Sequence, residues 1–224
     1  MKSLINDLKF HLEAAKNPSD ALQMKAYMKD HFEFLGIRAP ERKNIQKPWI
    51  SEVQKSLSTI EKWNLILELW KFNEREFQLV AMDLLNGFKK QEWTKEDISK
   101  FEYLLTTKSW WDSVDTIASN SLGVYFKQFP EQQKIITKKW SESGNIWLMR
   151  STIIFQLKYK NTTNFELLSS LIRKYQFNSE FFIQKAIGWS LRQYSKFNPE
   201  VVREFIYDTN LSGLAKREAS KYLN

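Results

Sequence analysis

The sequence predicts an all-α protein, an α-solenoid of stacked helical hairpins. Residues of the same class return every 35 residues, the connectors between the helices are short and polar, and no alternating run is long enough for a strand. Stacked hairpins of this length rotate slightly from one repeat to the next, which produces an extended concave surface. We therefore expect a solenoid with a concave groove.

The repeat appears in three registers of the sequence. Two apolar registers lie four positions apart, on one face of the first helix of each hairpin. The second helices carry a register of small residues. These registers are Ile66, Phe101, Ile136, Leu171 and Ile206; Trp70, Leu105, Trp140 and Tyr175; and Ala81, Thr116, Ser151 and Ala186. Large aromatics supply most of the apolar area that such hairpins bury, so we also place Trp63 in the core.

The helices follow from these registers and from their start signals. The first helices are expected at 59–70, 94–106, 130–141, 164–175 and 199–208, with Pro130 and Pro199 suited to a first turn. The second helices are expected at 73–86, 109–126, 145–158, 179–195 and 212–222. Connectors such as KFN and NTTN separate them.

The N-terminal segment fits the period poorly and is expected to cap the array. MKSLINDLKFHLEAAK and SDALQMKAYMKDHFEFL read as two helices, followed by a short helix that begins at Pro40 and is broken at Pro48. We predict one domain over 1–224, with a helical cap at 1–57 and about five hairpins at 58–224.

Composition restricts the function. The 34 Lys and Arg against 26 Asp and Glu give a net charge of +8, which favours a polyanion such as nucleic acid or an anionic membrane surface. The absence of Cys excludes disulfides, thiolate nucleophiles and Cys-ligated metals. His11 and His31 are too few for a metal cage, so we expect no metal and no cofactor. The expected groove is therefore basic, and any catalysis relies on carboxylates, aromatics and cations.

The N-terminus lacks the apolar run of a signal peptide, and no window approaches 18 apolar residues. We expect a cytoplasmic protein with no membrane contact.

Charged and aromatic residues gather at one position of the repeat. With about 100° per residue, they fall within a stripe of roughly 80° when the repeats are superposed. The set is Asp115, Arg150 and Lys185, one period apart, with Trp111, Trp189 and Arg192 nearby. The stripe has two readings at this point: a site for a polyanion, or a ladder of salt bridges between repeats.

Five short segments of the sequence are more specific than the 35-residue period. YMKDHFEFLGI, APERK, TKSWWDSVD, NIWLMRS and FFIQKAIGWSLRQY, in this order along nearly the whole chain, resemble the AlkD family of DNA glycosylases, which are built from HEAT-like repeats. The resemblance implies a monomeric enzyme that excises N3- and N7-alkylated purines, such as 3-methyladenine and 7-methylguanine, from double-stranded DNA. We expect the cytoplasm of a bacterium, with a substrate associated with the nucleoid.

The resemblance also implies roles for single residues. Asp115 looks like the catalytic carboxylate, with Trp111 and Trp189 as aromatic partners at the sugar of the lesion. Arg150, Arg192 and Tyr27 look like DNA-contacting residues, and Lys185 lies on the same stripe as a phosphate contact or structural partner. Two alternatives stay open: a catalytically silent DNA-binding paralogue, and a protein-binding helical scaffold.

Overall fold

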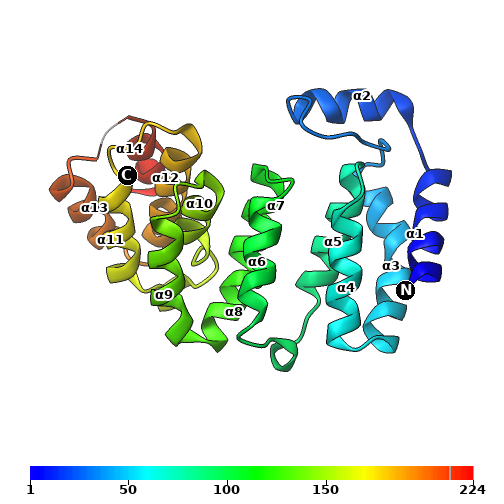
Figure 1. Cartoon of the computed structure of the whole chain (residues 1–224). Coiled ribbons are helices and arrows are strands. Elements are labelled where there is room, and N and C mark those ends of the chain that lie inside the picture. Colours follow the sequence, from blue (N-terminus) through cyan, green and yellow to red (C-terminus); the bar gives the residue numbers. More distant parts are fainter. Residues whose placement is uncertain (212, 224) are drawn as a thin grey trace. The chain divides into compact units, whose positions relative to one another are not determined.

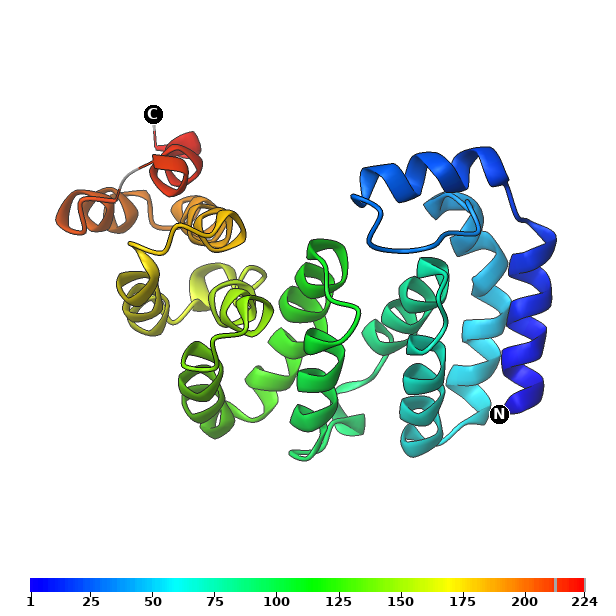
Figure 2. The same cartoon turned by 45° about the horizontal axis from the view of Figure 1, so that its top comes forward.

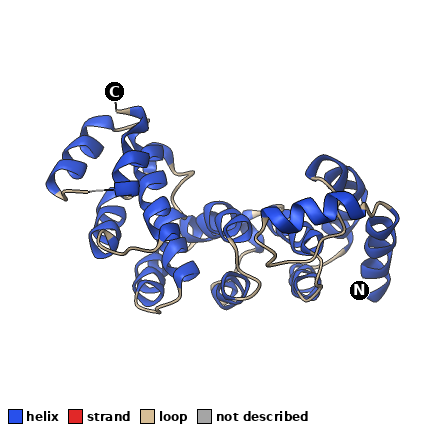
Figure 3. Ribbon diagram, turned by 90° about the horizontal axis from the view of Figure 1, so that it is seen from above, coloured by secondary structure: helices blue, strands red, loops and turns tan. Residues whose placement is uncertain are grey.

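The computed structural model describes residues 1–211 and 213–223, and in these residues the chain is helical (Figure 3). The described residues contain no strand, and one isolated bridge joins Glu33 to Glu74. The chain forms two compact units, Met1–Glu92 and Trp93–Asn224. The all-α prediction is confirmed. The prediction of one domain over 1–224, and that of a concave basic groove, stay predictions.

The first unit contains five α-helices and a 3-10 turn among its residues, all of which are described (Figure 1). They are α1 (Lys2–Ala14), α2 (Pro18–Tyr27), α3 (Ala39–Ser56), α4 (Thr59–Trp70), α5 (Arg75–Asn86) and η1 (Lys90–Glu92). A capping box of Ser58 and Glu61 begins α4 where the sequence predicts it. The pair α4–α5 is the first hairpin of the repeat.

A buried carboxylate ties α2 to this hairpin. Glu76, on α5, accepts backbone N–H groups from Leu35, Gly36 and Ile37 at 3.0, 2.9 and 3.1 Å. A side chain on Gly36, which has φ +89°, would meet the backbone oxygen of Asn17 at 2.0 Å. Only glycine fits this approach of the loop to the start of α2. The loop after α2 is thus fixed to the first hairpin by hydrogen bonds from its backbone N–H groups to the Glu76 carboxylate.

Two predictions for the cap are wrong. The helix α2 ends at Tyr27, so the following MKDHFEFL is not helical. The break at Pro48 is absent, because α3 runs through it to Ser56. Proline removes one helical hydrogen bond, whose acceptor is the carbonyl of Asn44. Both Asn44 and Pro48 are exposed. The missing hydrogen bond therefore lies on the exposed side of α3, and the helix continues through Pro48.

The second unit carries the later hairpins (Figures 1 and 2). Its elements are α6 (Asp97–Thr106), α7 (Trp111–Ile117), the π-helical turn η2 (Ala118–Leu122), α8 (Gly123–Gln128), α9 (Pro130–Ser141), α10 (Ile146–Ile154), η3 (Lys160–Thr162), α11 (Phe165–Tyr175), α12 (Phe181–Ser195), α13 (Pro199–Asp208), α14 (Gly213–Ala219) and η4 (Ser220–Tyr222).

The second helices of these hairpins pack on one another in chain order. Contacts link α7 to α10, α10 to α12 and α12 to α14. Asparagine side chains begin two of the helices: Asn145 accepts N–H groups at the start of α10, and Asn164 does so for α11. The helix predicted at 145–158 ends earlier, at Ile154. The chain leaves the helix there because the Gln156 side chain hydrogen-bonds the Asn164 backbone and closes a turn. The row α7, α10, α12 and α14 carries the stripe of charges.

The core of both units is the predicted one. Every residue of the two apolar registers is at most 7% exposed, and Trp63 is 1% exposed. Three of the small residues are fully buried, whereas Thr116 is half-buried. The 35-residue period therefore marks the packing face of each hairpin.

The expected helix 109–126 is interrupted by a π-helical turn. The chain is α-helical in α7, π-helical over Ala118–Leu122, and α-helical again in α8. A side chain on Gly123 would meet the backbone oxygen of Phe155 at 2.7 Å, and Tyr159 donates to the Gly123 carbonyl at 2.6 Å. The π turn begins at Ala118, three residues after Asp115, and such turns are frequent at functional sites.

No helix in the described part of the chain is long and apolar enough to cross a membrane.

Candidate active site

Asp115 and Arg150 are one period apart and form a bidentate ion pair between α7 and α10. Arg150 Nε donates to Asp115 Oδ1 at 2.7 Å, and Nη2 donates to Oδ2 at 2.8 Å. The side chain of Arg150 is 5% exposed and that of Asp115 is 18% exposed. The planar guanidinium therefore fixes the orientation of the carboxylate while part of the carboxylate stays open to solvent.

Arg150 is itself held from a third helix. Its Nη1 donates to the backbone oxygen of Phe182, and its guanidinium carbon lies 5.9 Å from the centre of the Phe182 ring. The Phe182 ring packs against Trp147 and Trp110, with ring centres 4.9 and 5.3 Å away. The guanidinium is thus immobilised by α7, α10 and α12 together.

Burial dominates the titration of this carboxylate. Removal from water raises the pKa of Asp115 above its ordinary value, and the hydrogen bonds and positive charge of Arg150 offset that effect only in part. Each carboxylate oxygen uses one acceptor position for Arg150 and keeps another, since an ionised carboxylate has about four lone-pair sites. The Asp115 carboxylate is therefore held in one orientation and keeps acceptor positions for a further hydrogen bond.

The two predicted tryptophans lie on the helices of this site. Trp111 is one turn before Asp115 on α7, where residues four apart are neighbours. Trp189 is one turn after Lys185 on α12. Both indoles are half-buried. The structure thus places both tryptophans on the row of second helices and leaves each partly accessible, and their contact with a lesion stays a prediction.

Lys185 and Arg192 are paired with a residue that the sequence analysis did not single out. Lys185 Nζ donates to Glu218 Oε1 at 3.0 Å, and Arg192 Nη1 donates to Glu218 Oε2 at 2.6 Å. Glu218 lies on α14 and is 6% exposed. The stripe of charges therefore contains two ion-pair groups in the described residues of this unit, one around Asp115 and one around Glu218.

Tyr27 belongs to the first unit. It is the last residue of α2 and is 67% exposed. The loop that follows it is the one fixed by Glu76. Its role at DNA stays a prediction.

Sequence reasoning missed Phe182, Trp147 and Glu218. A signal exists for the first two, because Trp147 and Phe182 are one 35-residue period apart, as Asp115 and Arg150 are. Glu218 lies 33 residues after Lys185, out of register with the repeat. Its signal is only the position of a carboxylate on the last helix, which the period does not identify.

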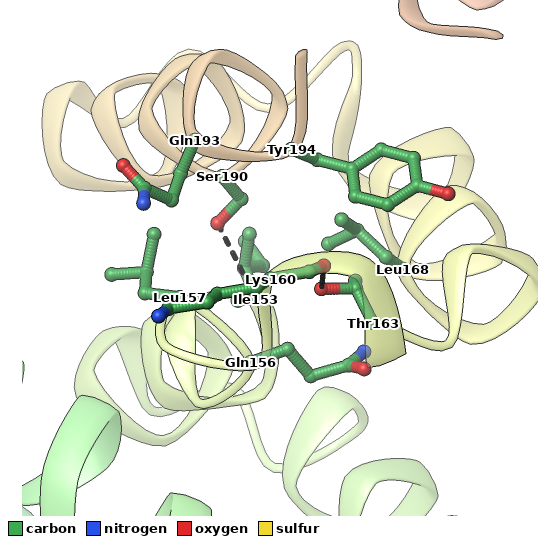
Figure 4. Close-up of a pocket in the computed structure, with 9 residues that line it drawn as sticks. All are labelled: Ile153, Gln156, Leu157, Lys160, Thr163, Leu168, Ser190, Gln193 and Tyr194. Atoms are coloured by element: carbon green, nitrogen blue, oxygen red, sulfur yellow. Dashed lines mark hydrogen bonds between the residues drawn. The ribbon is translucent and has the colours of Figure 1, made fainter. Parts of the chain in front are cut away.

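A small pocket lies between α10, α11 and α12 (Figure 4). Its volume is about 10 Å³, enough for roughly one water molecule. Ser190 donates to the backbone oxygen of Ile153 across it at 3.0 Å. This pocket is therefore too small for an extruded purine. Within the described residues, no group of three or more His, Asp and Glu side chains is placed to hold a metal ion.

The fold and the site define a class: a basic helical-repeat protein whose second helices present an oriented carboxylate among aromatic side chains. The family model described as DNA alkylation repair enzyme matches residues 8–223, and the chain belongs to this family. Family membership supports an enzymatic role in DNA repair.

A solved structure agrees with this membership. The chain is similar to a predicted DNA alkylation repair enzyme from Enterococcus faecalis, with 39% sequence identity and a TM-score of 0.86. The match covers 93% of this chain and 96% of that one, which supports the HEAT-like helical-repeat fold over nearly its whole length. No curated protein matches the chain.

Proposed function

We propose that the protein is a DNA glycosylase that hydrolyses the N-glycosidic bond of cationic N3- and N7-alkylated purines in duplex DNA. The observation that carries this proposal is the carboxylate of Asp115, which is oriented by Arg150 and remains 18% exposed. Trp111 and Trp189, on the same row of helices, supply half-buried indoles.

The chemistry suits these residue types. Alkylation at N3 or N7 gives the purine a positive charge, so the base leaves as a neutral molecule and needs no general acid. Positive charge then develops on the sugar, as in the oxocarbenium-like transition state of glycosidases. An oriented carboxylate stabilises that charge without reorganising during the reaction. Catalysis of this kind requires neither a histidine nor a metal.

Asp115 carries the central role in this proposal. Arg150 occupies one acceptor position on each carboxylate oxygen. In this proposal the remaining positions serve the sugar and the attacking water. The indole faces of Trp111 and Trp189 attract the cationic sugar, each by about 0.5–2 kcal/mol. The sequence predicts Arg150 as a contact of the DNA backbone, and that contact stays a prediction. Because its side chain is only 5% exposed, we propose that Arg150 acts mainly through Asp115.

A monofunctional enzyme, which releases the base without cutting the strand, is the simpler assignment. A bifunctional glycosylase needs an amine nucleophile, and an amine is nucleophilic only when it is deprotonated. Lys185 Nζ lies 3.0 Å from a Glu218 oxygen, so this amine is engaged in an ion pair. Lys185 therefore serves as a phosphate contact in this proposal.

Binding of DNA depends on phosphate neutralisation. Arg192 and Lys185 in the second unit and Tyr27 in the first are the proposed contacts, on a monomer acting in the bacterial cytoplasm. Each neutralised phosphate releases counterions, so affinity falls steeply with salt.

A specific observation favours a second candidate, a catalytically silent DNA-binding protein. An ion pair between repeats also joins Glu102 on α6 to Lys139 on α9, at 2.7 Å, in the row of first helices. The pair of Asp115 and Arg150 is then one more structural link of this kind. The two candidates differ in whether a base is released.

The deciding experiment incubates the protein with methylated duplex DNA and measures free 3-methyladenine and 7-methylguanine by chromatography. The proposal expects release of both bases, with strands that stay intact until they are treated with alkali. If the protein binds the methylated duplex but releases neither base, the result would support the silent candidate and overturn the enzyme assignment.

A further inference from the structure

Three cations converge on one buried carboxylate at the end of the second unit. Lys221, which no part of the site above uses, donates from Nζ to Glu218 Oε1 at 3.0 Å and lies 2.9 Å from Oε2. Lys185 and Arg192 donate to the same carboxylate at 3.0 and 2.6 Å. This Glu218 cluster, which consists of Glu218, Lys185, Arg192 and Lys221, draws on α12, α14 and η4.

The carboxylate of Glu218 is buried, whereas the three cationic side chains are partly exposed to solvent. The Glu218 side chain is 8% exposed, whereas those of Lys185, Arg192 and Lys221 are 38%, 24% and 49% exposed. A molecule that approaches this surface therefore meets the positive groups first. Three positive charges against one negative charge leave an excess of two.

The cations keep donors for a ligand. The guanidinium of Arg192 has five N–H groups, and only Nη1 has a hydrogen-bond partner among the described residues. Each ammonium has three N–H groups, and Lys185 uses one of them for Glu218. The Glu218 cluster can therefore donate outward while its inner face is satisfied.

The segment that carries Lys221 is fixed from two sides. Arg203, on α13, donates to the backbone oxygen of Leu223 at 2.7 Å. Lys196, just after α12, lies 4.9 Å from the ring centre of Tyr222. Lys221 is therefore presented by an anchored turn, which reduces the entropy that it loses when it binds a ligand.

Close packing also places Glu218. A side chain on Gly188 would lie 2.4 Å from the Cβ of Glu218 and 2.8 Å from the backbone oxygen of Ala215. Glycine at 188 lets α14 approach α12 closely enough for one carboxylate to reach both Lys185 and Arg192. Its hydrogen bonds from Lys221 and then Lys185 lower the pKa of Glu218 to about 2, so it is ionised at neutral pH.

We propose that Lys221, Lys185 and Arg192 together bind a phosphate diester of the DNA backbone, and that Glu218 is a positioning residue that holds the three cations for it. This inference rests on the proposed function, which makes DNA the ligand. It adds the C-terminal turn to the DNA-contacting surface, beyond the helices that carry the candidate active site.

The test is a binding titration with a short undamaged DNA duplex at several salt concentrations. Lys221→Gln is expected to weaken binding and to lower the slope of log affinity against log salt by about one, as for one lost phosphate contact. Lys139→Gln is the matched control, because it removes the same charge from an ion-paired lysine in the row of first helices. The control is expected to keep the wild-type slope.

Glu218→Gln tests the positioning role. The substitution adds one positive charge to the protein, so charge alone predicts tighter DNA binding. Loss of the carboxylate releases the three cations, so the proposal predicts weaker binding, with thermal melting recorded to verify the fold. If the Glu218→Gln variant does not fold, the salt slope of the Lys221→Gln variant alone tests the proposal.

Two results would overturn the inference. A Lys221→Gln variant with the wild-type salt slope would remove Lys221 from the phosphate site. A folded Glu218→Gln variant that binds DNA more tightly would show that Glu218 only lowers the charge. Undamaged DNA is used throughout, so these results do not depend on whether the protein releases bases.

Discussion

The ion pair of Asp115 and Arg150 yields a prediction for a double-mutant cycle. Asp115→Asn keeps the shape of the side chain and removes its charge, and Arg150→Met keeps much of the length and removes every donor. Because the two groups make two short hydrogen bonds, at 2.7 and 2.8 Å, their effects on the free energy of unfolding must be coupled.

The magnitude follows from burial. Removing one partner of a buried ion pair costs about 3–5 kcal/mol, because the other charge is left unpaired. Arg150 is 5% exposed, but Asp115 is 18% exposed, and the Phe182 carbonyl still accepts from Arg150 after Asp115 is changed. Partial solvation places each single substitution nearer 2–3 kcal/mol, and the coupling energy at about 2 kcal/mol.

Urea denaturation of the wild type, both single variants and the double variant measures this coupling. The pair of Glu102 and Lys139 gives the matched control cycle, since their side chains are 32% and 60% exposed. For the control, a coupling below about 1 kcal/mol is expected. Additive effects at Asp115 and Arg150 would show that the guanidinium does not hold the carboxylate, and would refute the reasoning.

The remaining predictions concern pH and the indoles. Base release is expected to fall as pH decreases, because protonation removes the charge of Asp115, with a midpoint above the ordinary range for aspartate since burial raises the pKa of Asp115. A pH–rate profile with its acid limb in the ordinary range would contradict this. Trp189→Leu is expected to slow base release about 2–30-fold, the loss of one cation–π contact, with little change in DNA affinity. Single-turnover rates and a binding titration separate the two effects, and an unchanged rate would exclude Trp189 from the transition state.

Much of the fold is predictable from the sequence, because the repeat fixes the packing face. The registers at Ile66 and Trp70 identify the core, and Pro130 and Pro199 mark helix starts that the structure keeps. Pro48 is the instructive failure. Sequence alone treats an internal proline as a break, but the cost depends on whether the freed carbonyl meets water, which only the packing of α3 decides.

The candidate site is predictable to a lesser degree. The period places Asp115 and Arg150 at equivalent points, and the structure joins them directly. Lys185 occupies the next equivalent point but pairs with Glu218 instead. A period gives the angular position of a residue on its helix, whereas the partner depends on side-chain length and on the approach of helices such as α12 and α14. Glycines such as Gly188 control that approach, and the period does not show them.

The most direct test of the central claim is the single-turnover rate at which Asp115→Asn releases 7-methylguanine from duplex DNA, measured beside its DNA affinity. The account predicts a rate roughly 100- to 1000-fold below wild type, the usual effect of removing one preorganised electrostatic group, with affinity for undamaged DNA preserved. A folded variant that releases the base at the wild-type rate would contradict it, and Asp115 would then be a structural link between repeats.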